Sequence, residues 1–130
     1  MKTALSVWND RISPVFDSAR TLLIAEIKKG KIIDRYYEPV HFDFPSSRTL
    51  KIFSLGVDVL ICGAISHLYA DMIEAYNIRL IPFIAGNTEQ VLDAYLKGIL
   101  PAPEFQMPGC GMKRQPEIRG GQSMETCRNK

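Results

Sequence analysis

The alternation of apolar and polar positions along the chain predicts short β-strands in both halves. Five runs rich in apolar and β-branched residues predict strands, over residues 2–8, 21–27, 31–37, 57–62 and 78–84. The second and third runs are joined by Lys28-Lys29-Gly30, which is typical of an antiparallel hairpin. The last two runs are short and mainly apolar, as strands buried on both faces of a sheet are. Residues 9–18 contain Asn, Asp, Ser and Pro, which predicts a loop.

Two segments in the middle of the chain have the spacing of amphipathic helices. The first covers residues 46–56, with Ser46 or Ser47 as its N-cap. The second begins after Ser66 and runs to about residue 76. The apolar residues expected to face the core are Leu50, Phe53 and Leu55 in the first helix and Leu68, Met72, Ile73 and Tyr76 in the second.

A third helix is predicted where Asn87-Thr88-Glu89-Gln90 resembles a capping box, and it ends at Gly98. The predicted order is therefore β-β-β-α-β-α-β-α. The first half is a meander, and the alternation in the second half predicts parallel strands joined by right-handed crossovers. The fold class is α/β, with a mixed sheet of about five strands covered by flanking helices.

The pattern changes at Pro101, so residues 1–100 form the predicted domain. Residues 101–130 contain four prolines, four glycines and scattered charge, without an apolar period. Such a segment buries too little surface to offset the entropy lost when it orders. We therefore predict a flexible tail, which carries Cys110 and Cys127.

Composition and charge narrow the function classes. Hydrophobic residues make up 46% of the chain and charged residues 23%, as in ordinary globular proteins. A formal net charge of +2 gives no reason to expect attraction to nucleic acid or to an anionic membrane. We find neither a membrane-spanning run nor a signal peptide. The three cysteines are an odd, widely spaced set, which argues against a disulfide framework and favours the reducing cytoplasm.

Ligands of α/β sheets bind beyond the carboxyl ends of parallel strands. Three predicted loops meet at that edge, residues 9–18, 62–67 and 85–88. The last two run directly into helix N-termini, where free N–H groups and the helix dipole favour anions. We therefore expect an anionic ligand at this edge, and a metal–sulfur cluster is one such ligand.

Three side chains are candidate metal ligands. Cys62 ends a buried strand and is either a thiolate at the mouth of the site or a small buried hydrophobe. His67 offers an imidazole at the same edge, or is a solvated residue at a helix start. Cys110 lies between two glycines in Met-Pro-Gly-Cys-Gly-Met and is either a soft ligand or an incidental thiol in the tail. Close ligand spacings such as CxxC are absent, which argues against a structural zinc site.

Three segments resemble a known family when they are taken together. They are RISPVFDSA at residues 11–19, GVDVLICGAI at residues 56–65 and GNTEQVLDAYLKG at residues 86–98. In this order and spacing they resemble the dinitrogenase iron–molybdenum cofactor biosynthesis family over about residues 2–100. The MPGCGM segment of the tail is similar to tails of stand-alone, orange-protein-like members of that family.

The resemblance implies a ribonuclease H-like fold without nuclease activity. It also implies binding or carriage of a metal–sulfur cofactor or its precursor, of the iron–molybdenum or iron–sulfur type. The first loop of the family usually reads His-Phe-Gly, where this chain has Val15-Phe16-Asp17. Cys62, His67 and Cys110 are the candidates to replace that imidazole. The residues expected to line the cofactor site are Asn9, Arg11, Ser13, Gly63, Ser66 and Gly86.

The leading hypothesis is therefore a non-enzymatic accessory protein of cofactor assembly. Its alternative is a metal-free interaction module that docks an assembly ATPase or another partner protein. A third interpretation is a metal-dependent nuclease that uses Asp10. It is disfavoured because Asp10 follows the first strand while Asp58 precedes the fourth, at the opposite edge of the sheet.

Overall fold

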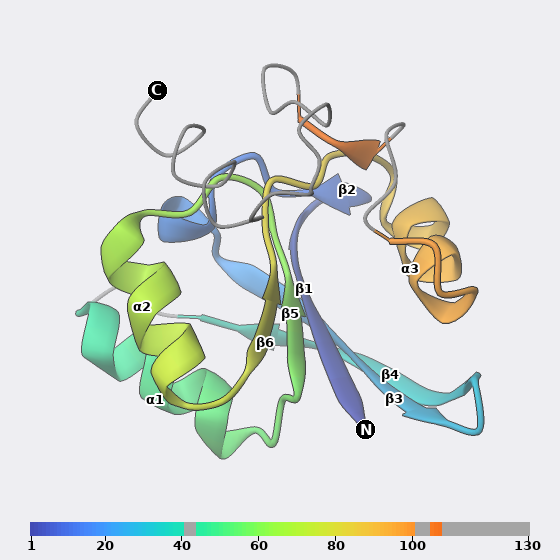
Figure 1. Cartoon of the computed structure of the whole chain (residues 1–130), viewed down its shortest axis with the longest axis horizontal. Helices are drawn as coiled ribbons and strands as arrows, with labels where there is room; N and C mark the ends of the chain where they lie inside the picture. The colour runs from blue at the N-terminus through green and yellow to red at the C-terminus, as the bar shows by residue number, and fades with distance from the viewer. Residues whose placement is uncertain (41–43, 101–104, 108–130) are drawn as a thin grey trace, which may run out of the picture.

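A computed structural model describes residues 1–40, 44–100 and 105–107 of the chain (Figure 1). Within these residues the chain forms six strands, three α-helices and one 3-10 helix. In chain order they are β1 (Lys2–Trp8), β2 (Arg11–Ile12), the 3-10 helix η1 (Phe16–Ser18), β3 (Thr21–Lys28), β4 (Lys31–Pro39), α1 (Pro45–Ser54), β5 (Val59–Ile61), α2 (His67–Ala75), β6 (Arg79–Ile81) and α3 (Thr88–Leu96).

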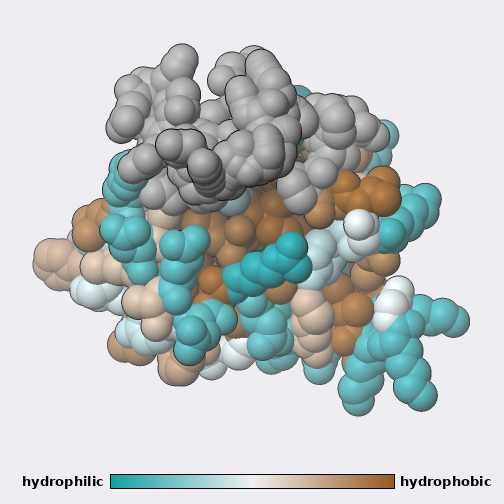
Figure 2. Space-filling model, viewed as in Figure 1, coloured by the Kyte–Doolittle hydropathy of each residue, from teal (hydrophilic) through white to brown (hydrophobic). Residues whose placement is uncertain are grey.

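The strands form one mixed sheet in the order β4-β3-β1-β5-β6, and β2 pairs with the end of β1. β3 is antiparallel to both β1 and β4, whereas β5 is parallel to both β1 and β6. The predicted hairpin, the parallel second half and the mixed α/β class are thereby confirmed. The β3–β4 hairpin turns at Lys28-Lys29-Gly30-Lys31, and Figure 2 shows its hydrophilic tip at the lower right.

Helices cover both faces of the sheet, α1 and α2 on one side and α3 on the other (Figure 1). Side chains of β1 alternate between two core clusters, because successive residues of a strand point to opposite faces. Ala4 packs with the cluster under α1 and α2, and Leu5 and Val7 pack with the cluster under α3. The central strands are therefore buried on both faces, as their apolar sequences predict.

The structure differs from the sequence-based strands and loops in two places. The predicted loop 9–18 contains β2 and η1, because Val7 and Trp8 pair with the two residues of β2. The predicted strands 57–62 and 78–84 shorten to the three residues each of β5 and β6. Beyond them, Cys62 N donates to Ile81 O at 3.1 Å, and Cys62 O accepts a hydrogen bond from Ile84 N at 3.0 Å.

The first helix buries a different face from the one predicted. It begins at Pro45, with Phe44 as an N-cap that makes no side-chain hydrogen bond. Leu50 and Phe53 are 54% and 49% exposed, so the prediction that they face the core is wrong. The buried residues of α1 are Arg48, Thr49 and Ile52. The spacing identified the helix, but the buried face depends on contacts with distant segments.

The caps of the other two helices are confirmed. The Ser66 hydroxyl accepts a hydrogen bond from Tyr69 N at 3.3 Å, and Asn87 caps α3. Ile73 is buried as predicted. Leu68 is 54% exposed and Tyr76 36% exposed, because α2 turns these side chains away from the sheet, so their predicted place in the core is wrong.

Candidate functional site at the carboxyl edge of the sheet

The loops that follow β1 and β5 are joined by backbone hydrogen bonds at the carboxyl edge. Ala64 N donates to Pro14 O at 2.8 Å, and Phe16 N donates to Ala64 O at 2.7 Å. Val15 and Ala64 form an isolated parallel bridge between these bonds. The first loop therefore extends the parallel pairing of β1 and β5 beyond the ends of both strands.

The loop after β6 is tied to the same surface. Ile12 N donates to Gly86 O at 2.9 Å, and Phe83 N donates to Gly63 O at 2.9 Å. Arg11 and Asn87 form an isolated antiparallel bridge beside them. The three loops that the sequence brings to this edge are thus held together as one surface.

Gly63 makes the contact between the first two loops possible. A Cβ added at this position would lie 2.4 Å from Ser13 O and 2.5 Å from Pro14 O, well inside van der Waals contact. The geometry gives Gly63 a packing role. Its predicted contact with a cofactor stays a prediction.

A carboxylate side chain of the protein lies at the N-terminus of α2. Ser66 N donates to Asp17 Oδ1 at 3.1 Å, which places the carboxylate of the first loop at the start of the helix. A negative charge in this position interacts favourably with the helix dipole. Asp17 therefore already occupies part of the anion-favouring turn that the sequence predicts.

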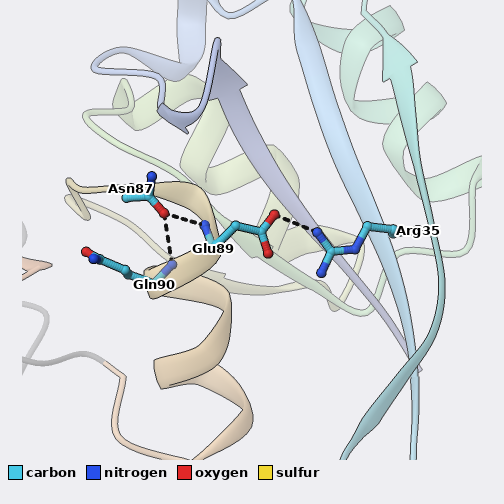
Figure 3. Close-up of polar contacts among 4 residues, drawn as sticks. All are labelled: Arg35, Asn87, Glu89 and Gln90. Atoms are coloured by element: carbon cyan, nitrogen blue, oxygen red, sulfur yellow. Dashed lines mark hydrogen bonds and ion pairs between the residues drawn. The ribbon is translucent and has the colours of Figure 1, made fainter.

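The amides of the first turn of α3 are also occupied (Figure 3). Thr88 N donates to Asp10 O at 2.9 Å. Asn87 Oδ1 accepts hydrogen bonds from Glu89 N at 2.9 Å and from Gln90 N at 3.2 Å. An exogenous anion at this helix end would have to displace acceptors that the chain itself supplies.

An ion pair connects this helix to the far part of the sheet. Arg35 Nη1 of β4 lies 2.6 Å from Glu89 Oε2 (Figure 3). Both side chains are well exposed, so the pair contributes little to the free energy of unfolding. It spans the face of the sheet between α3 and β4.

The buried side chain of Arg48 contacts the backbone of the first loop. Arg48 of α1 is 2% exposed, and its Nη1 donates to Phe16 O at 2.6 Å. Its guanidinium carbon lies 5.3 Å from the ring centre of Phe16 and 5.5 Å from that of Tyr69. Burial lowers the pKa of Arg48, whereas the neighbouring Tyr69 and Asp17 raise it. Arg48 was not singled out from the sequence, because its partners lie far away along the chain.

A cleft of about 600 Å³ opens beside the first loop, on the side of β3 and β4. Its walls come from the end of β1, the first loop, the start of β3 and one residue of β4. Asn9 and Ser13, both predicted to bind a cofactor, line this cleft. Asn9 has a φ of 60°, a left-handed conformation that Asn tolerates at tight turns.

The other predicted cofactor-binding residues do not line this cleft. Exposed Arg11 bridges to Asn87, and Ser66 caps α2. Gly86 has a φ of 134°, and a Cβ on it would lie 3.0 Å from the ring of Phe105. Of the six predicted residues, two therefore line the cleft, and the other four lie in contacts between the loops or at the start of α2.

The three predicted metal ligands are not gathered into one cluster. The Cys62 side chain is fully buried in the core under α1 and α2, which fits the small-hydrophobe interpretation left open by the sequence. His67 is exposed at the first residue of α2. Cys110 and Cys127 lie outside the described residues. Over the part of the chain that is described, no group of three His, Cys, Asp or Glu side chains could hold a metal ion.

The chain returns to this edge after α3. Ala85 N donates to Phe105 O at 2.6 Å, and Met107 N donates to Phe83 O at 3.0 Å. Phe83 has a φ of 62°, which is unusual for a bulky residue and is held by backbone bonds on both sides. Phe105–Met107 thus pair with the domain, although the predicted division assigns them to the tail.

Comparison with known proteins identifies the family. A family model described as dinitrogenase iron–molybdenum cofactor matches residues 1–98. The chain belongs to this family. Curated proteins gave no sequence match. Within the described residues, no helix is long and apolar enough to cross a membrane.

Solved structures similar to this chain share its fold. The protein PH0822 superposes with a TM-score of 0.71 at 17% identity, over 75% of this chain and 90% of that one. A dinitrogenase-like protein from Methanocaldococcus jannaschii gives 0.63 at 21% identity, over 76% of this chain and 90% of that one. A NifB-like protein from Thermotoga gives 0.58 at 18% identity, over 91% and 98%. These likenesses confirm the fold class.

The resemblance drawn from the sequence implies that the first loop departs from the family's usual His-Phe-Gly at Val15 and Asp17. Val15 stands where the family usually has His, and it is 42% exposed on the wall of the cleft. Asp17 stands where the resemblance implies Gly, and its carboxylate accepts a hydrogen bond from the N–H of Ser66, the N-cap of α2. The chain thus lacks an imidazole in this loop and carries an extra negative charge that its own helix holds.

Proposed function

We propose that the protein binds or carries a metal–sulfur cargo, of the iron–molybdenum or iron–sulfur type, as an accessory protein of cofactor assembly. In this proposal it catalyses no reaction of its own. Membership of the family supports a role linked to this cofactor. The observation that carries the proposal is the return of Phe105–Met107 to the carboxyl edge, where the loops after β1, β5 and β6 meet.

The anchored segment limits how far the thiol of the tail can lie from this edge. Cys110 follows Met107 by three residues, and an extended chain covers at most about 3.6 Å per residue, so their Cα atoms are within about 11 Å. A thiolate and a thioether are soft ligands suited to iron–sulfur and molybdenum–sulfur species. Cys110 is therefore the proposed principal ligand of the cargo.

The remaining predicted residues take supporting roles in the proposal. His67 is an exposed imidazole at the same edge, and Arg11 supplies positive charge to an anionic cargo. Asn9 and Ser13 offer polar groups from the first loop. Cys62 would reach the cargo only if the core beneath Phe16 opened, so we assign it to packing.

Anaerobic purification with metal analysis and a visible spectrum tests the proposal. Protein incubated with iron and sulfide, or with a thiomolybdate, is expected to become coloured and to retain metal through gel filtration. Cys110→Ser should lose this uptake. Cys127→Ser is the matched control in the same tail and should keep it. If the wild-type protein stays colourless and metal-free under all of these conditions, the proposal is wrong.

A second candidate is a metal-free module that docks an assembly ATPase or another partner. Its support is four exposed apolar side chains in α1, in α2 and at the end of α2, namely Leu50, Phe53, Leu68 and Tyr76. The rings of Phe53 and Tyr76 stack with centroids 4.7 Å apart. This function predicts that Phe53→Asp abolishes binding to a purified ATPase, whereas Cys110→Ser has no effect on it. The converse result rejects it.

A further inference from the structure

Two large aromatic side chains stand exposed on the walls of the cleft beside the first loop. Trp8 ends β1 and is 60% exposed, and Tyr37 on β4 is 62% exposed. Neither side chain belongs to one of the two hydrophobic core clusters. An exposed Trp and an exposed Tyr that share one hollow are typical of a surface that binds a ligand.

Among the described residues that line the cleft, one carries a formal charge, and that charge is positive. Arg20 is its charged lining residue, and none of the described residues that line it is acidic. Asp17 lies next to the lining residue Ser18, but its carboxylate accepts a hydrogen bond from Ser66 N at the start of α2. An arginine guanidinium carries several donors in a planar fork that suits carboxylate and phosphate groups.

The size and the polar groups of the cleft fit a small ligand. Its volume of about 600 Å³ lies within the range of small-molecule sites, about 300–1,000 Å³. Asn9, Ser13, Ser18 and Thr21 add hydrogen-bonding groups to the walls of the cleft. A flat ring can stack on an aromatic side chain while an attached anionic group pairs with an arginine.

We propose that this cleft binds a small organic anion that carries a flat ring, of about the size of a mononucleotide. The ring packs against Trp8 or Tyr37, and the anionic group pairs with Arg20. This site goes beyond the proposed function, because it needs neither a metal nor Cys110. It occupies the side of the first loop that faces β3 and β4, away from the anchored segment Phe105–Met107.

Fluorescence of the metal-free protein tests the site directly, because Trp8 is the one tryptophan of the chain. AMP serves as the probe, with adenosine as the ring without the anion and ribose 5-phosphate as the anion without the ring. AMP is expected to change the Trp8 emission saturably. Each fragment should bind at least about tenfold more weakly than AMP, since each lacks one of the two interactions.

Four variants separate the cleft from the rest of the surface. Arg20→Gln should weaken AMP binding about tenfold or more, the loss of a charge-assisted hydrogen bond. Tyr37→Ala should weaken it by about fivefold or more, the loss of a stacking contact. Arg79→Gln and Tyr76→Ala, exposed residues that do not line the cleft, are the matched controls and should leave it unchanged.

The proposal is overturned by any of three results. One is the absence of a saturable change at about 10 mM AMP, well above a millimolar dissociation constant. Another is binding of either fragment as tightly as AMP. The third is equal weakening by the cleft variants and the control variants, in proteins whose unfolding shows that they are folded. Metal uptake and AMP binding are measured separately, so failure of one leaves the other standing.

Discussion

Replacing Gly63 by Ala tests whether the carboxyl edge depends on the close approach of its loops. The added Cβ would lie 2.4 Å from Ser13 O, 2.5 Å from Pro14 O and 2.8 Å from Pro14 C. Two backbone segments would have to separate by about 1 Å to restore van der Waals contact. Backbone atoms, unlike the ends of flexible side chains, cannot swing aside.

The expected loss in free energy of unfolding follows from the hydrogen bonds that this separation would break. Ala64 N–Pro14 O at 2.8 Å and Phe16 N–Ala64 O at 2.7 Å lie directly beside the added methyl group. Loss of two backbone hydrogen bonds costs about 1 kcal/mol each, and forcing a methyl group into a packed site costs about 1–3 kcal/mol. We expect Gly63→Ala to lower the free energy of unfolding by about 3–5 kcal/mol, measured by urea denaturation.

Gly98→Ala is the matched control for the backbone cost alone. Gly98 has a φ of 76° with no atom within 4 Å of an added Cβ, so its replacement carries only the strain of the left-handed conformation. We expect a loss of about 1–2 kcal/mol there. A Gly63→Ala protein that is no less stable than Gly98→Ala would refute the steric argument for this edge.

The remaining predictions concern the groups that hold the first loop, each measured by urea denaturation. Asp17→Ala should lower the free energy of unfolding by about 1–2 kcal/mol and Asp17→Asn by less, because Asn retains an acceptor for Ser66 N; equal losses would contradict this. Arg48→Met should cost about 1–3 kcal/mol, because Phe16 O would lose its charge-assisted hydrogen bond from Arg48 and keep only the one from Ala19 N, and an unchanged stability would reject that contact. Burial raises the pKa of Tyr69, opposed by Arg48 and assisted by Asp17. Because its pKa is higher in the folded state, protonated Tyr69 contributes to the free energy of unfolding. This contribution is fully present below the unfolded pKa of about 10 and is lost as the pH rises through the folded pKa. Tyr69→Phe should therefore flatten the fall in stability above pH ~10, and an unchanged slope would contradict that assignment.

Local signals in the sequence identified those features of the fold that depend on neighbouring residues. Ser66 and Asn87 were predicted as helix caps, because a cap bonds to amides only two or three residues away. The hairpin turn was predicted for the same reason. The parallel pairing of strands in the second half was predicted from the alternation of strands and helices, and the resemblance of three segments pointed to the family.

The buried face of α1 could not be predicted in the same way. Leu50 and Phe53 are the more apolar residues, yet Arg48 faces the core because its guanidinium reaches Phe16 O, 32 residues earlier in the chain. Such a contact leaves no periodic signal in the helix. The same holds for Asp17 and Ser66, which are 49 residues apart.

The sequence pointed to some of the residues that line the cleft, and their role in binding stays a prediction. The sequence pointed to the first loop, and Asn9 and Ser13 do line the cleft. It missed Trp8, Arg20 and Tyr37, because they come from the end of β1, the residue before β3 and the strand β4, and meet only once the sheet has formed. The return of Phe105–Met107 to the edge was likewise hidden, since the prolines and glycines around it predict a separate tail.

The central claim is the proposal that Cys110 holds a metal–sulfur cargo. The most direct measurement is the metal bound per chain after anaerobic reconstitution of the wild-type protein, Cys110→Ser and Cys127→Ser. We predict stoichiometric metal and a visible spectrum for the wild type and for Cys127→Ser, with both lost in Cys110→Ser. Metal-free wild-type protein, or equal loading of all three proteins, would contradict the claim.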